Sequence, residues 1–174
     1  MVPFKYGVVG GVLSIILFFV VYLLGENPLV PNHLDFFVNS IILLVFIIFS
    51  IREFRISYNS NILHFLQGIT IGILTVIIIG LITSISMYVY LTYFNYDLLN
   101  SYKEIMDEQL RTNKETYIEQ FDENIFNMLI VENQRISPIK LAQNEFLKKK
   151  LLVGFFVTII VSVIMRRSPV VINK

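Results

Sequence analysis

Few residues of this 174-residue sequence are of the types that carry out chemistry. Cysteine is absent, which excludes disulfides, a thiolate nucleophile and cysteine-built zinc or iron–sulfur sites. The two histidines, His33 and His64, are expected on opposite sides of a membrane and so cannot share a metal. The carboxylates expected near lipid headgroups, where a lipid-modifying enzyme would need them, are Glu26, Asp35, Glu53 and Asp97. Neither a Ser/His/Asp arrangement nor a phosphate-binding glycine loop nor an HExxH motif occurs, so we expect no enzymatic activity, metal or cofactor.

The composition indicates a membrane protein. Apolar residues make up 55 % of the sequence and charged residues 16 %, whereas soluble domains average about 45–50 % and about 25 %. The net charge of +1 leaves no basic surplus of the kind that nucleic-acid-binding proteins carry. We therefore expect membrane lipid as a partner and exclude nucleic acid.

Four apolar segments predict an all-α integral membrane four-helix bundle, one membrane domain over residues 1–174. The first segment is about 30 Å long as a helix, which matches the thickness of the hydrocarbon core. Because no small-x-small cleavage site precedes Glu26, we expect this segment to be retained as a membrane span and not cleaved as a signal peptide. Ser137 and Pro138 form an N-cap and first-turn proline that predict a last helix from about Pro138 to Arg167. The predicted spans cover about residues 6–25, 35–52, 64–94 and 148–166.

Basic residues at the span ends predict the orientation. The side that holds the termini carries Lys5, Lys174 and four arginines, whereas the connection 26–35 on the other side has no Lys or Arg. The positive-inside rule therefore places both termini in the cytoplasm. The lysine triplet before the fourth span opposes this orientation. Residues expected to contact lipid headgroups or a partner are Lys148, Lys149, Lys150, Arg52, Arg55, Arg166 and Arg167.

Residues 97–138 are expected to form a helical extracytoplasmic cap between spans 3 and 4, because unstructured loops of that length are uncommon. Apolar residues recur there at three- and four-residue steps. We expect the third helix to extend into the cap, a break near Thr112 and Asn113, and a second amphipathic helix to about Val131. Its apolar face could pack on the bundle, which we favour, or lie on headgroups or meet a partner; its acidic surface disfavours an anionic leaflet.

Small residues at four-residue spacing indicate close helix contacts in lipid. These candidate helix-packing residues are Gly7, Gly11, Gly68, Gly72, Gly80, Gly154, Thr158 and Ser162. We expect them to close the bundle within one chain rather than to mediate dimerisation. Because the uncharged central runs of these spans contain no Asp, Glu, Lys or Arg, we do not expect an ion-coupled pump.

The order of these features resembles a known family. Tyr6-Gly7 with Gly10-Gly11, the turn at 25–28, the Phe65-x-x-Gly68-x-x-x-Gly72 entry and the final Arg166-Arg167 are similar to small four-span inner-membrane proteins of Bacteroidota classed as a domain of unknown function. The fourth span lacks the proline expected in that family. The resemblance implies a bacterial inner-membrane location but does not indicate any activity. It also suggests a gene neighbourhood that contains a cytoplasmic glycosyltransferase acting on polyprenyl phosphate.

Two functions follow from this reading. The first is a non-catalytic accessory, anchoring or assembly subunit for a partner protein, such as that glycosyltransferase, or for a homo-oligomer. The second is a lipid- or polyprenyl-binding or translocating protein, which would need a mostly apolar cleft with a cationic mouth at 148–150.

Overall fold

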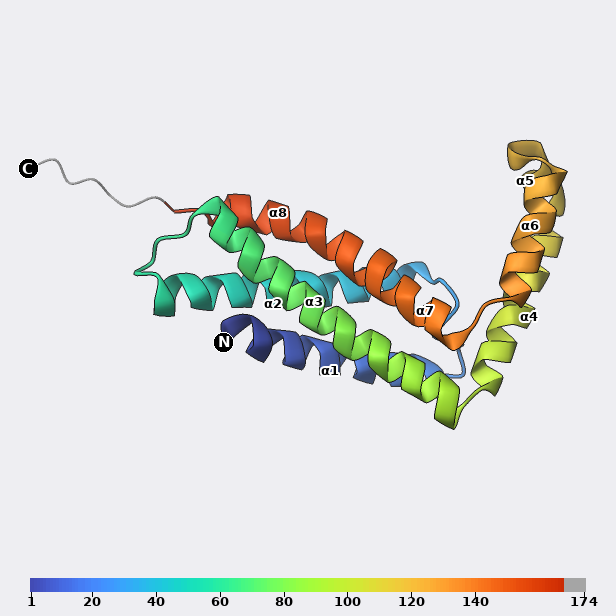
Figure 1. Ribbon diagram of the computed structural model, residues 1–174, viewed down its shortest axis with the longest axis horizontal. Coiled ribbons are helices and arrows are strands. Elements are labelled where there is room, and N and C mark those ends of the chain that lie inside the picture. Colours follow the sequence, from blue (N-terminus) through green and yellow to red (C-terminus); the bar gives the residue numbers. More distant parts are fainter. Residues whose placement is uncertain (168–174) are drawn as a thin grey trace, which may run out of the picture.

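The computed structural model describes residues 1–167, all of whose regular elements are helices (Figure 1). Lys174 lies outside the described residues. The helices before the cap are α1 (Val2–Leu23), α2 (His33–Tyr58), α3 (Phe65–Val89) and the π-helical turn η1 (Tyr90–Phe94). The cap contains α4 (Asp97–Thr112), α5 (Lys114–Phe121) and α6 (Glu123–Gln134). The chain returns through α7 (Pro138–Asn144), the π-helical η2 (Glu145–Leu152) and α8 (Val153–Met165).

Four helical rods lie side by side in the main body. They are α1, α2, α3 and one continuous rod made of α7, η2 and α8 (Figure 1). The chain keeps helical dihedral angles at Glu145 and Val153, where these three elements meet. Ser137 caps this rod by accepting a hydrogen bond from the amide of Lys140 at 3.4 Å, as its sequence predicts.

Three of the described helices are long and apolar enough to cross a membrane: α1, α2 and α3 with η1. Their mean hydropathy is 2.4 to 2.5 over an 18-residue window. Many large apolar side chains on the rods face outward; Ile164 on α8, for example, is 75 % exposed. Such a surface suits lipid rather than water, and the chain therefore has the character of a membrane protein.

Small residues lie where the rods approach each other. A Cβ added to Gly7 would lie 2.6 Å from Cβ of Ile78 on α3, and one added to Gly72 would lie 2.5 Å from Cγ2 of Thr158 on α8. The remaining members of the predicted set lie at contacts of the same kind. Gly11 meets Ile82, Gly68 meets Ser162, Gly154 meets Val76, and Gly80 meets Phe146 and Lys150. Contacts this close exclude larger side chains and increase dispersion contact between the rods.

Two apolar clusters hold the molecule together. One lies within the bundle and includes Leu43, Ile47 and Ile51 of α2 with Ile79 of α3. The other joins the bundle to the start of the cap. It contains Leu29, Met87, Leu91, Leu98, Leu99, Tyr102, Leu141 and Ala142. The first turns of α4 are thus fixed to the bundle, while α5 and α6 pack mainly on each other and on α4.

The cap differs from its sequence prediction in two places. Helix α3 does not extend straight into it, because the chain leaves the helical conformation at Asn95, whose side-chain oxygen accepts from the Leu98 amide at 3.1 Å. The break at Asn113 occurs as expected, but the following helix is interrupted again at Asp122. Asp122 has φ 101° and its carboxylate accepts from the Glu123 amide at 2.6 Å. The predicted cap segment therefore consists of three helices, and the Asp122 side chain caps the third of them.

Candidate functional site

A cavity of about 200 Å³ lies in the bundle at the end nearest the cap. Its walls come from α1, the α1–α2 turn, α2, α3, α4, α7 and η2. The apolar wall consists of Phe18, Leu29, Met87 and Leu141, together with Pro28 and Pro31. The polar wall consists of Ser14, Asp35, Asn39, Thr83, Tyr102, Asn144, Glu145, Lys148 and Lys149. The cavity lining thus contains both apolar side chains and a group of charged side chains.

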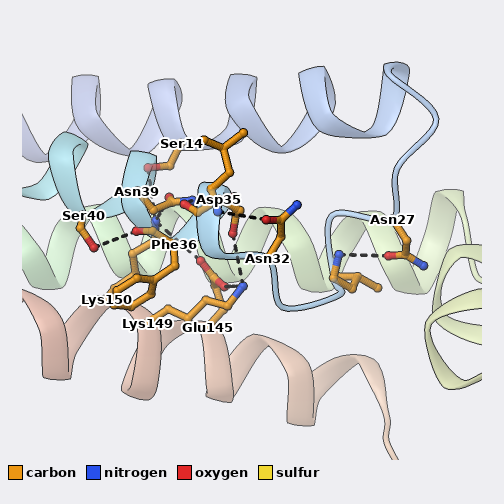
Figure 2. Close-up of polar contacts among 12 residues, drawn as sticks. Ser14, Asn27, Asn32, Asp35, Phe36, Asn39, Ser40, Glu145, Lys149 and Lys150 are labelled. Atoms are coloured by element: carbon orange, nitrogen blue, oxygen red, sulfur yellow. Dashed lines mark hydrogen bonds and ion pairs between the residues drawn. The ribbon is translucent and has the colours of Figure 1, made fainter. Parts of the chain in front are cut away.

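The charged side chains form a closed ring between α2 and η2 (Figure 2). Lys150 donates to the side-chain oxygen of Asn39, whose amide nitrogen donates to Asp35 at 2.9 Å. Nζ of Lys149 lies 3.7 Å from Asp35 and 3.3 Å from Glu145, and Nζ of Lys150 lies 3.6 Å from Glu145. Each carboxylate therefore has a lysine partner, and the ring holds two of the four rods together.

The π-helical geometry of η2 makes this ring possible. Glu145 is four positions before Lys149 and five before Lys150. In an α-helix five positions advance the chain about 140° past a full turn, which would point Lys150 away from Glu145. A π-helix closes its hydrogen bonds from i to i+5, so residues four and five positions apart both lie beside the first. Two consecutive lysines consequently reach the same carboxylate.

Lys150 is the most deeply buried charged residue of the described chain. Its relative exposure is 0 %, and that of Glu145 is 7 %. Nζ of Lys150 also lies 3.5 Å from the hydroxyl of Ser14 on α1. A buried ammonium is costly unless it is paired and hydrogen-bonded, and Lys150 has a carboxylate, an amide oxygen and a hydroxyl around it.

This burial corrects two expectations drawn from the sequence. Lys150 contacts neither lipid headgroups nor a partner surface, because η2 turns it into the bundle. The bundle interior is also not free of charge, because it contains the Lys150 and Glu145 pair. Sequence reading missed Glu145, Asp35 and Asn39 as members of one site. Their shared i, i+4 spacing, Asp35 to Asn39 and Glu145 to Lys149, was the signal that could have found them.

Two polar side chains of the cavity keep hydrogen-bonding capacity for a ligand. Lys148 is exposed at the cavity, and no carboxylate of residues 1–167 lies within ion-pair distance of it. Tyr102 reaches the cavity from α4. Burial raises the pKa of its phenol, against a smaller opposing effect of Lys149, so that Tyr102 stays protonated and can donate.

The other predicted contact residues lie far along the bundle from this cavity. Arg52 and Arg55 on α2, and Arg166 and Arg167 after α8, lie toward the end that holds the N-terminus (Figure 1). Arg55 donates to the carbonyl of Met165 at 3.3 Å, and the backbones of Leu63 and Arg167 bond each other at 3.0 Å. The structure therefore separates the four arginines from the lysine triplet.

No group of three or more His, Asp or Glu side chains among residues 1–167 is arranged to hold a metal ion. The candidate site is a cavity with charged lining residues, and it presents lysine and hydroxyl groups to its interior.

A protein family described as a protein of unknown function, DUF4199, matches residues 5–167. The chain belongs to the DUF4199 family. The match includes every residue of the cavity and of the ionic ring, and it confirms the resemblance to a domain of unknown function. No curated protein and no solved structure matches this DUF4199 chain.

Proposed function

We propose that this DUF4199 chain is a four-span protein of the bacterial inner membrane that binds a membrane amphiphile in its cavity and does not transform it. The observation that carries this proposal is the cavity itself, whose lining combines apolar side chains such as Phe18 and Met87 with Lys148 and Lys149. An amphiphile has the matching division into an apolar and a polar part. The cavity supports the lipid-binding function through Lys148 and Lys149, whereas Lys150, the third lysine expected at the mouth, is buried.

The size of the cavity supports binding of only the polar end of such a molecule. Its volume of about 200 Å³ is below the roughly 300–1,000 Å³ of sites that enclose a whole drug-sized ligand. A separate apolar pocket of about 20 Å³ lies between α1 and α3, shares Phe18, Thr83 and Met87 with the cavity, and is also lined by Phe19 and Tyr90. Phe19 is 37 % exposed on the outside of the bundle.

The fourth crossing is supported by the α7–η2–α8 rod. It lies along α3, and its α8 part exposes Phe156, Ile160 and Ile164 by more than half of their surface. The arginines at the far end favour a cytoplasmic position for both termini. The cap and the cavity would then lie at the extracytoplasmic face.

Binding without turnover is supported by the state of the carboxylates. Asp35 and Glu145 each lie next to a lysine, so both carboxylates are engaged in ion pairs within the chain. A hydrolase or transferase acting on the bound molecule would need an activated nucleophile.

An accessory or assembly role is the second candidate. It is favoured by α5 and α6, which expose Phe121, Ile125 and Met128 by 52 %, 41 % and 63 %. Exposed apolar side chains on a helix that stands away from the bundle suit contact with another protein.

Native mass spectrometry of the purified chain tests the proposal. Asn144 lines the cavity, whereas its neighbour Gln143 is exposed outside it. Asn144→Trp fills the cavity and should abolish retention of the amphiphile, while the matched control Gln143→Trp should retain it. Equal retention by both variants would show that the amphiphile does not use the cavity.

A further inference from the structure

The hydrogen-bonding groups around the cavity are mainly donors. Lys148 has no carboxylate partner among residues 1–167, and Tyr102 keeps its proton. The hydroxyl of Thr83 already donates to the carbonyl of Ile79 at 2.8 Å. The carboxylates of Asp35 and Glu145, which could accept, are directed toward Lys149 and Lys150. The ammonium of Lys148 and the phenol of Tyr102 are thus the donors available to a ligand, while the two carboxylates are paired with lysines, which favours an anion.

The charges of the site lead to the same conclusion. Three lysines, Lys148, Lys149 and Lys150, face two carboxylates. Lys148, an exposed residue of the cavity lining, is the lysine left without a carboxylate from residues 1–167, so its positive charge is available to attract an anion. A zwitterionic headgroup carries its own cation and would not neutralise this charge.

The three lysines have different roles. Lys150 is fully buried and directed to Asn39 and Ser14, so it holds η2 against α1 and α2. Lys149 is 31 % exposed, and its distances of 3.3 and 3.7 Å to carboxylates exceed the 2.7–2.9 Å of a strong charge-assisted hydrogen bond. Lys149 can therefore turn toward a ligand with little loss of ion-pair energy. Lys148 has no ion pair among residues 1–167 that would have to break first.

Resting on the proposed function, we infer that the bound amphiphile has a phosphate headgroup of net negative charge, held by Lys148 and Lys149 with Tyr102 donating to a phosphate oxygen. Its hydrocarbon part lies on the apolar wall at Phe18 and Met87. The ring of Asp35, Asn39, Glu145 and Lys150 positions Lys149. Lysine binds phosphate as a point charge, and lipid phosphates occur at the depth where a span ends.

Lipid titrations of the full chain in detergent, followed by native mass spectrometry, test this inference. The probes are phosphatidylglycerol and phosphatidylcholine with identical acyl chains, each with and without millimolar inorganic phosphate. Wild-type protein should bind phosphatidylglycerol about tenfold more tightly than phosphatidylcholine. Lys148→Gln should remove most of this preference, whereas the control Lys140→Gln, an exposed lysine of α7 outside the cavity, should keep it.

Several results would overturn the inference. Equal affinity for the two lipids, with both lost in Asn144→Trp, would contradict the anionic headgroup and leave the proposed function standing. Lipid binding that Asn144→Trp leaves intact would instead contradict the proposed function. Displacement of phosphatidylglycerol by inorganic phosphate would show that the site takes free phosphate rather than a lipid, and equal effects of Lys148→Gln and Lys140→Gln would remove Lys148 from the site.

Discussion

The ammonium group of Lys150 and the carboxylate of Glu145 lie 3.6 Å apart although five positions separate them on one helix. The π-helical turn η2 brings them to the same side. Both side chains are buried, and the pair connects to Asn39 and Asp35 across the bundle. Local widening of the helix thus creates the charged wall of the cavity.

Removing one partner of this pair should destabilise the bundle. Glu145→Gln leaves the buried ammonium of Lys150 without its carboxylate, and breaking a buried pair in this way costs about 3 kcal/mol. Thermal unfolding in detergent should show a clear fall in Tm. Glu108→Gln, at an exposed position of α4, should change stability by less than about 0.5 kcal/mol; equal effects of the two substitutions would contradict the ring.

Removing both partners should cost less than the single changes suggest. In Lys150→Met with Glu145→Gln, no uncompensated buried charge remains, so stability should recover by about 1–3 kcal/mol relative to the sum of the single variants. A double-mutant cycle of unfolding free energies measures this. Strict additivity would show that Lys150 and Glu145 do not interact.

The close contact of α3 with α8 predicts a size limit at Gly72. Gly72→Ala places a Cβ 2.5 Å from Cγ2 of Thr158 and should destabilise the bundle by about 1–3 kcal/mol. Adding Thr158→Ala should restore part of the loss, because it removes the clashing methyl group. Ile160→Ala, on the outward side of α8, is the control; a loss at Ile160 as large as that at Gly72 would contradict the contact.

The proposed orientation predicts where the cap lies. A reporter that is active only outside the cytoplasm should be active when it is fused after Asn113, between α4 and α5. The same reporter fused after Tyr58, at the end of α2, should be inactive, because that end is predicted to lie in the cytoplasm. Cytoplasmic activity of the Asn113 fusion would reverse the orientation of the whole bundle.

The all-helical architecture and its apolar helices could be predicted from the sequence because they depend on local pattern. The apolar runs appear as α1, α2 and α3, and Ser137 and Asn113 mark helix ends as expected. The fourth crossing stays a prediction, since α8 has 13 residues and its helical rod begins well before its apolar part.

The site could not be predicted in the same way. A reading based on 3.6 residues per turn separates Lys150 from Glu145, and the π-helical turn that unites them is stabilised by contacts with Asn39 and Ser14, which are distant in sequence. Asp35 was recognised as a carboxylate at a span end, but its pairing with Lys149 depends on how α2 packs against η2. Tertiary contacts therefore define the cavity.

The most direct test of the account is to identify what the chain retains when it is extracted gently from its native membrane. Native mass spectrometry should find about one phosphate-bearing amphiphile per chain, kept by Gln143→Trp and lost by Asn144→Trp. Wild-type protein that retains no amphiphile beyond the level of Asn144→Trp would contradict the central claim that the cavity is a lipid-binding site.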